Sequence, residues 1–437
     1  MARRFLFTAL LLVSCRGFSF AQAFPQVSLN LQQAEQTALQ NHPQIQAAAD
    51  VAGTAQAQVT QARSAYYPLA YGSATGSYAE NNTRIGAGAI NSPRVFDRYG
   101  NGITVSQLVS DFGRTHELVK SSSEHAKAEQ ENVAATREQI LLQVDGAYFS
   151  VLRAQAVLVV AQQTVKSRQL VSDQVTELEK NKIKSGLDVS FANVNLSQAQ
   201  LLLIQAQNDL QASFAQLSAA LGYSGQRTFQ LAEEPLPAAP PADVSVLIQA
   251  ALRDRPELIG QRLGVQSAQS YATAERDLWF PTVSAVGVAG LVPVVAAGGL
   301  APTTLPAPRY AAAGFNVNIP IFNGHQFGAL RAEANYQAEA QKQYLRDLQN
   351  RITRDVQLAW LNANSGFQRL SVTQQLLAEA NDALDLAQSR YRLGLSSIVE
   401  LSQAQLNQTQ ALIDETSAKY DYEAQISALN FQLGALH

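Results

Sequence analysis

FNVNIPIFNG, residues Phe315–Gly324, alternates apolar and polar side chains and ends at a glycine where a long helical pattern begins. Alternation with a period of two predicts a β-strand with one apolar and one polar face. A counterpart, ITVSQLVSDFG, occupies Ile103–Gly113 and also leads into a long helical pattern. Such strands suit either a half-buried soluble sheet or a membrane barrel with a wet lumen. The remainder of the chain decides between these two folds.

The composition argues against several classes of protein. The 437 residues carry a net charge of −3, so the charge balance does not favour nucleic acid as a partner. A single cysteine excludes an intramolecular disulfide framework, and no clustered His/Cys pattern predicts a metal site. Neither a GxSxG nucleophile motif nor a glycine-rich phosphate loop is present. We therefore expect neither enzymatic activity nor a cofactor.

Residues 1–23 predict a signal peptide, in which two arginines precede the apolar run Phe5–Val13 and a small-x-small site places cleavage after Ala23. The alternative is a lipoprotein signal, because the Leu-Val-Ser before Cys15 resembles a lipoprotein box, and Cys15 would then be lipidated. Lipidation would add a membrane anchor without changing the fold. Both alternatives predict an exported protein. No later segment offers about 18 unbroken apolar residues, so we expect no transmembrane helix.

The two halves of the chain match each other at a nearly constant offset. Pro43 and Pro68 recur 213 positions later as Pro256 and Pro281. An offset of 212 relates Val144 to Val356, Tyr148 to Trp360, Ser185 to Ser397, Asp188 to Glu400, and Leu221 to Leu433. An offset held over most of both halves predicts an internal duplication.

The predicted repeats share one order of elements. Repeat 1 covers 24–232, with helices at 29–64, strands at 67–80 and 99–112, and a long helical hairpin at 114–221. A proline-rich linker follows at 233–243. Repeat 2 covers 244–437, with helices at 244–278, strands at 281–292 and 310–322, and a long helical hairpin at 325–433.

The helical hairpins are unusually long. From Arg114 to about Asn181 there is no proline, and at roughly 1.5 Å per residue this run spans on the order of 100 Å. Apolar residues recur at heptad spacing in both repeats, which predicts coiled-coil packing. Each long helix reverses near 182–186 or 393–397, and the shorter return helix leaves part of its partner uncovered. We expect the short helix at 44–64 to stack end to end with the return helix and cover the remainder.

Four strands cannot close a membrane barrel alone, because the smallest barrels need about eight. Two long hairpins per chain likewise line a hollow tube only if several protomers complete the ring. The chain is therefore expected to share its barrel with copies of itself. In that barrel Asn316 and Asn318 would face the lumen, and Phe315, Val317, Ile319 and Ile321 the lipid.

Several segments carry a family resemblance: the duplicated helix-proline-helix start, N-I-P-I-F-N-G at 318–324, R-Y-R-L-G-L-S-S-I-V-E-L-S-Q-A-Q at 390–405, and Leu-Gly at 221–222 and 433–434. With these segments the chain resembles the TolC family of outer-membrane efflux channels over essentially its whole mature length. The resemblance implies an α+β membrane protein, internally duplicated and homotrimeric. Each protomer would contribute four strands to a shared trimeric outer-membrane β-barrel and long coiled-coil hairpins to a periplasmic α-barrel.

The same resemblance implies partners and sites. A periplasmic membrane-fusion (adaptor) protein, joined to an inner-membrane pump, would contact the helical tips, while outer-membrane lipid surrounds the barrel. The adaptor-contacting tips would be Lys182, Ile183, Lys184, Ser185, Arg392, Leu393, Gly394 and Leu395. Lys182 departs from the family pattern, in which a glycine is usual.

The resemblance also implies a pore constriction formed by Glu400, Gln403 and Asp188. Glu400 stands where the family places an acidic ring that narrows the closed pore, and Gln403 where a second acidic residue occurs. Some family members have an arginine at the position of Ser396 that helps to lock the closed state, and Asp188 stands where the partner of that arginine lies. The three Glu400 carboxylates of a trimer, one from each protomer, would attract cations and repel one another in a narrow entrance. Closure of the pore would therefore depend on pH and divalent ions.

The function predicted in this way is a trimeric outer-membrane channel that serves as the passive exit duct of a tripartite efflux or type I secretion system. The alternative is a structural periplasmic coiled-coil protein without channel activity, which would be extracted without detergent. The sequence does not distinguish drug, metal and protein cargo, because selection belongs to the pump.

Overall fold

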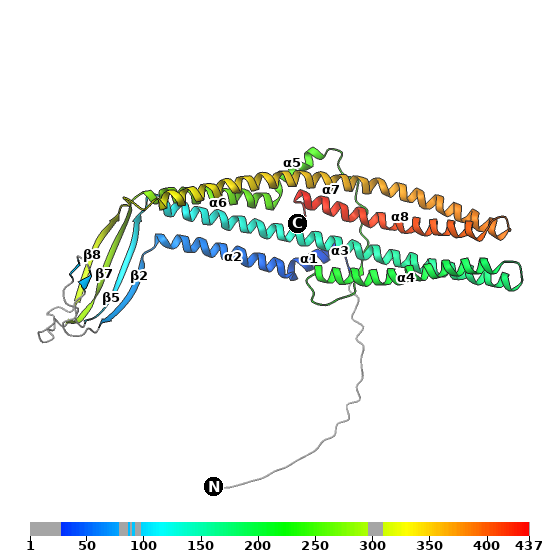
Figure 1. Ribbon diagram of the computed structural model, residues 1–437, viewed down its shortest axis with the longest axis horizontal. Coiled ribbons are helices and arrows are strands. Elements are labelled where there is room, and N and C mark those ends of the chain that lie inside the picture. Colours follow the sequence, from blue (N-terminus) through cyan, green and yellow to red (C-terminus); the bar gives the residue numbers. More distant parts are fainter. Residues whose placement is uncertain (1–27, 78–85, 88–89, 92–97, 296–308, 437) are drawn as a thin grey trace, which may run out of the picture.

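The structure is a computed structural model that describes residues 28–77, 86–87, 90–91, 98–295 and 309–436. The four-stranded sheet lies at one end of an elongated molecule, and the long helices run from it to the opposite end, where each hairpin turns (Figure 1). The predicted signal peptide at 1–23, with Cys15, lies outside the described residues.

Two helical hairpins make up the length of the molecule. Helices α3 (Arg114–Lys180) and α7 (Gln326–Arg392) contain 67 residues each, which corresponds to about 100 Å. Helices α4 (Gly186–Ala220) and α8 (Ile398–Leu433) return along them. Both hairpins turn at the reversal positions expected from the sequence.

The predicted heptad seams are the buried faces of the long helices. In α3, Val144 and Val151 are fully buried, and Leu158 and Val165 are half-buried. In α7, the buried residues are Ala334, Ala338, Ile352, Val356, Ala363, Gly366, Thr373, Ala380, Ala387 and Tyr391. Helix α3 also contains an 18-residue window apolar enough to cross a membrane by composition, but 56% of that window is buried inside the structure. Packing against neighbouring helices explains its apolarity.

The sheet joins the two repeats. It contains β2 (Leu69–Ser77), β5 (Arg98–Ser110), β7 (Thr282–Val295) and β8 (Arg309–Asn318) in the antiparallel order β2-β5-β7-β8 (Figure 1). The central pairing, β5 with β7, connects repeat 1 to repeat 2. A short pair, β3 (Gly86–Ala87) and β4 (Ile90–Asn91), lies in the connection between β2 and β5.

The register of β7 and β8 confirms the two-faced strand. Asn316 lies opposite Ser284 on one face, whereas Phe315 lies opposite Ala285 on the other. Phe315 is 78% exposed in the single chain, so the face of the sheet on which it lies is free to contact a surface outside the chain.

The predicted strand 310–322 is too long. Strand β8 ends at Asn318, because Pro320 has no N–H to continue the ladder. Ile319 and Ile321 therefore extend beyond the strand rather than sharing the face of Phe315. The first strand, predicted at 67–80, begins only at Leu69, after Pro68. The second, predicted at 99–112, ends at Ser110.

Each repeat begins with two short helices separated by a proline. These are α1 (Leu31–Asn41) and α2 (Pro43–Arg63) in repeat 1, and α5 (Val244–Asp254) and α6 (Pro256–Arg276) in repeat 2. Both prolines take the first helical position, where the missing N–H costs nothing. Single 3₁₀ turns, η1 (Ser64–Tyr66) and η2 (Asp277–Trp279), then lead into the sheet.

The short helices complete the layer formed by the return helices. Helices α2 and α4 lie end to end along α3, as expected (Figure 1). A Cβ on Gly222, whose φ is +83°, would lie 2.8 Å from the carbonyl oxygen of Asn41. Its repeat equivalent, Gly434 with φ +70°, approaches Arg255 in the same way. Both junctions therefore need glycine for conformation and for space.

The linker is held by aromatic donors on the helices. A short parallel pair, β1 (Ser28–Leu29) with β6 (Gln230–Leu231), precedes it and was not expected from the sequence. The hydroxyl of Tyr148 donates to the carbonyl oxygens of Leu29, at 3.0 Å, and Ala232, at 2.6 Å. The indole of Trp360, the repeat equivalent of Tyr148, donates to Pro241 at 2.7 Å. Equivalent positions therefore fasten the two ends of the linker.

Candidate functional site

Both hairpin tips have the same backbone turn. Gly394 has a φ of 73°, and Lys182, at the equivalent position, has a φ of 60°. In each turn the N–H that follows this residue donates, at 2.9 Å, to the carbonyl five residues earlier. Lys182 therefore takes the left-handed position that glycine usually occupies at a helix C-terminus. The departure of Lys182 from the family pattern leaves the turn unchanged.

The tips expose large apolar side chains together with basic ones. Between 53% and 74% of each of these side chains is exposed: Ile183, Leu187, Leu393, Leu395 and Val399. Lys182 and Arg392 are exposed beside them, and Lys184 is half-buried. Apolar groups gathered on a surface of this kind are typical of a docking site for another protein.

The two tips are packed against each other. A buried cluster of Val175, Ala192, Ala387, Tyr391, Ile398 and Leu401 joins the hairpins behind the turns. Lys184 of the first tip places its Nζ 3.8 Å from the ring centroid of Tyr391 in the second. Burial, followed by the negative charge of Asp188, raises the pKa of the Tyr391 phenol to about 12. Tyr391 belongs to the predicted seam, but its contact with Lys184 was missed.

Asp188 is engaged in a helix cap. Its Oδ2 accepts from the Ser185 hydroxyl at 2.6 Å and from the Ser185 N–H at 3.0 Å, which closes a capping box at the start of α4. The hydrogen bond from Ser185 is the main reason that the pKa of Asp188 is lowered. Asp188 therefore stabilises the tip, in addition to any role at the pore.

Glu400 has a different partner, although it also begins its helix. Its Oε1 lies 3.2 Å from Nε of Arg390 on α7, and both side chains are about half exposed. Gln403, one turn further along α8, donates to Asn407 at 2.9 Å. The three predicted pore residues therefore have three separate partners within one chain. Arg390 was missed, although a basic residue facing Glu400 across a tight hairpin could have been paired with it from the sequence.

A polar layer joins the two hairpins a few helical turns from the tips, in the direction of the sheet. Arg168 of α3 is 5% exposed and donates to the Gln405 carbonyl at 2.7 Å and to the Thr409 hydroxyl at 2.9 Å on α8. Burial lowers the pKa of Arg168 to about 10. Asn195 of α4 donates to the Ser402 hydroxyl at 2.7 Å. The hairpins are thus connected by hydrogen bonds as well as by apolar contacts.

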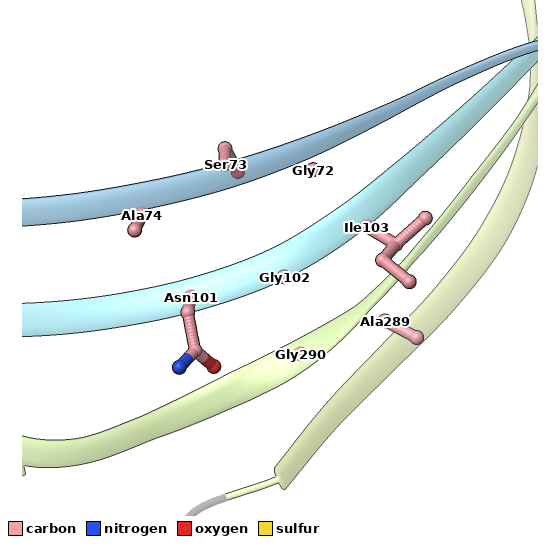
Figure 2. A pocket seen from close by; sticks show the side chains of 8 residues that line it. All are labelled: Gly72, Ser73, Ala74, Asn101, Gly102, Ile103, Ala289 and Gly290. Atoms are coloured by element: carbon pink, nitrogen blue, oxygen red, sulfur yellow. The ribbon is translucent and has the colours of Figure 1, made fainter. Parts of the chain in front are cut away.

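The sheet contains a shallow cavity of about 490 Å³. Figure 2 shows its lining, which consists of Gly72, Ser73, Ala74, Asn101, Gly102, Ile103, Ala289 and Gly290. Gly102, Gly290 and Tyr310 are neighbours in register on three strands. The Tyr310 hydroxyl lies where a Cβ on either glycine would be. The cavity reflects small side chains between strands and contains no cluster of ionisable groups.

No group of three or more His, Cys, Asp or Glu residues in the described part of the chain could hold a metal ion. The tips and the polar layer between the hairpins therefore constitute the candidate site.

Comparison with known proteins places these features in context. A family model described as outer membrane efflux protein matches residues 34–223 and, separately, 247–435. The two matches correspond to the two predicted repeats and confirm the duplication.

The chain also resembles individual proteins over nearly its full length. It is 27% identical over 424 residues to the toluene efflux pump outer membrane protein TtgC of Pseudomonas putida, covering 91% of this chain and 81% of TtgC. It is 24% identical over 418 residues to the outer membrane protein TolC of Escherichia coli, covering 93% and 83%.

Solved structures share the fold. The outer-membrane channel OprN superposes with a TM-score of 0.81 at 20% identity, covering 93% of this chain and 90% of that one. The CmeC outer membrane channel of Campylobacter jejuni superposes with a TM-score of 0.77 at 18% identity, covering 93% and 85%.

Proposed function

Because this chain belongs to the outer membrane efflux protein family, we propose that three copies of it form the passive exit duct of a tripartite efflux or type I secretion system. The protein is an outer-membrane efflux channel that extends into the periplasm. The sheet spans the membrane, and the hairpins carry the duct towards the inner membrane.

The proposal of a multimer rests on the two open edges of the sheet. In the order β2-β5-β7-β8, the outer edges of β2 and β8 have no partner strand within the described chain. Backbone groups in lipid must all be hydrogen-bonded, so a membrane sheet closes on itself. Three copies of four strands would give twelve, with β8 of one protomer beside β2 of the next. The same ring would close the helical hairpins into a tube.

Two measurements on the purified protein test this function. Native mass spectrometry in detergent is expected to give three times the mass of the mature chain. Reconstitution in planar bilayers is expected to give discrete conductance steps, with detergent alone as the control. A trimer that conducts under no combination of voltage, pH and salt would contradict the duct. A conducting protein of another stoichiometry would contradict only the trimer.

We also propose roles for the tips. Their exposed apolar and basic side chains would dock a periplasmic adaptor, which in turn reaches an inner-membrane pump. Glu400, repeated around the axis of the trimer, would form the carboxylate ring at the pore entrance, with Arg390 as its counter-charge. Gln403 and Asp188 would line the wall beside that ring.

A further inference from the structure

Helix α1 and the linker cross the helical hairpins at a waist between the sheet and the tips (Figure 1). A group of acidic side chains lies there, and two of them are buried. This waist cluster consists of Glu35 on α1, Asp145 on α3, Glu423 on α8, and Glu233 and Glu234 in the linker. Asp145 is 1% exposed and Glu423 is 2% exposed. Such burial is rare for acidic side chains that are not paired with a cation.

The buried carboxyl groups are poorly satisfied. Both carboxyl oxygens of Glu423, and Oδ1 of Asp145, are buried without a hydrogen-bond partner in the described part of the chain. Lys419 is the nearby cation, but its Nζ lies 2.7 Å from Glu233, on the exposed side of the cluster. A buried carboxylate without a partner is strongly disfavoured, so the neutral acid is the stable form. Burial accordingly raises the pKa of Glu423 to about 7.

Glu35 and Asp145 form a carboxyl pair. Helix α1 packs on α3 through a cluster that includes Ala34, Val144 and Tyr148, so Glu35 lies beside Asp145. Two carboxyl groups in such contact hydrogen-bond to each other only with a proton between them. The neighbouring Ser427 hydroxyl lowers the pKa of Asp145, which favours Glu35 as the group that carries the proton. Burial first, and then the charge of Asp145, raises the pKa of Glu35 to about 7. Burial raises that of Asp145 to about 6.

At the junction of α5 with α7 in the second repeat, the positions equivalent to this carboxyl pair hold no acids. Helix α5 packs on α7 as α1 packs on α3, but the positions of Glu35 and Asp145 are occupied by Ile248 and Gln357. Ile248 packs against the apolar cluster around Ala251. Gln211 and Ala215 replace Glu423 and Ser427 in the same way. Docking of the short helix therefore does not itself require carboxyl groups at these positions, and their presence at only one of the two junctions needs a separate reason.

We propose that the waist cluster is a proton-dependent clasp, in which a proton shared between Glu35 and Asp145 holds α1 and the adjoining linker against α3 and α8. The linker is coupled to α1 because Glu234 accepts from the N–H of Leu31 at 3.2 Å. Loss of the proton leaves two adjacent negative charges and releases this side of the waist. Glu423 is a titratable neighbour of the pair. The other titratable groups that face the pair or Glu423 are Glu233, Glu234, Lys419, Tyr148 and Tyr420.

The direction of the pH dependence follows from the raised pKa values. Between an unfolded pKa near 4.5 and a folded pKa of about 7, the docked helix binds more protons than the released one. Its stability is therefore complete at low pH and is lost as the pH rises through about 7. Because the periplasm follows the external medium, the clasp would respond to the acidity outside the cell.

Hydrogen exchange on the full-length mature protein in detergent tests the clasp. Protection of peptides within 31–41 and 244–254 would be compared from pH 5.5 to 8.5, after correction for intrinsic exchange. Protection of α1 is expected to fall by about thirtyfold relative to α5, because the interval from pH 5.5 to the folded pKa of about 7 spans about 1.5 units and each unit corresponds to a tenfold change. Glu35→Gln and Asp145→Asn should each abolish this difference, whereas Asp50→Asn, an exposed carboxylate on α2, should leave it intact.

Two results would overturn the clasp. One is an equal pH response of α1 and α5 in the unaltered protein, which needs no variant to be folded. The other is an undiminished response in Glu35→Gln or Asp145→Asn while Asp50→Asn behaves as the unaltered protein. Either result leaves the proposed exit duct intact, because conductance and trimer formation are measured independently.

Discussion

Lys182 and Gly394 hold equivalent positions with nearly the same left-handed backbone, although one has a side chain and the other has none. The left-handed region costs an ordinary residue roughly 1–2 kcal/mol. The first tip retains this less favourable residue, and its Lys184 contacts Tyr391 of the other hairpin.

Glu400→Gln is predicted to change the ion preference of the channel. The substitution removes the proposed carboxylate ring, so cation selectivity and block by divalent cations should both weaken in planar bilayers. Arg390→Met should act in the opposite direction, because it leaves Glu400 without its counter-charge. Trimer stability should change by less than about 1 kcal/mol in either variant, since the pair is half exposed.

The control is Glu179→Gln, an exposed acid at the end of α3. If Glu400→Gln and Glu179→Gln alter selectivity equally, or neither alters it, Glu400 does not face the pore.

At the scale of the element, the sheet depends on a strand register that places Gly102 and Gly290 beside the ring of Tyr310. Gly290→Val is predicted to prevent assembly, because its Cβ would meet the Asn101 carbonyl oxygen and the Tyr310 ring. Overpacking of this kind costs about 1–3 kcal/mol or more. The readout is the amount of protein that reaches the outer membrane and resists dissociation in SDS.

Gly287→Val on the same strand is the matched control, because a Cβ there would meet nothing within 4 Å. Equal assembly of the two variants would show that the glycine row has no packing role.

Sequence periodicity specified most of the elements. Heptad spacing predicted which faces of α3 and α7 are buried, because a helix places every third or fourth residue on one side. Alternation predicted the two faces of β8, but it overestimated its length. The apolar alternation continues through Ile321, whereas the ladder ends at Asn318, before Pro320 interrupts hydrogen bonding. Side-chain polarity and backbone pairing are separate properties, and only the first is visible as a pattern.

At the scale of the whole molecule, the tips lie at the end remote from the sheet, where a duct would meet its partner (Figure 1). Leu393→Asp is predicted to weaken binding of the cognate adaptor by at least about tenfold, because a charge replaces an apolar contact. Surface plasmon resonance with the purified adaptor measures the effect. Leu393 is 74% exposed, so the fold should be unaffected.

Val51→Asp, at an exposed position on α2 far from the tips, is the control. Unchanged affinity in Leu393→Asp, with conductance preserved, would place the adaptor contact elsewhere on the duct.

By itself the sequence determined the duplication, the long hairpins, the seams, the tips and the need for further copies, because each follows from periodicity, offset or strand number. The tertiary structure alone decided which polar groups meet: Glu35 with Asp145, Arg390 with Glu400, and Arg168 with Gln405. The reason is physical. A helix face that is buried along its length produces a periodic pattern of apolar residues in the sequence. A hydrogen bond joins two particular atoms that can lie far apart in the chain, so it produces no such pattern.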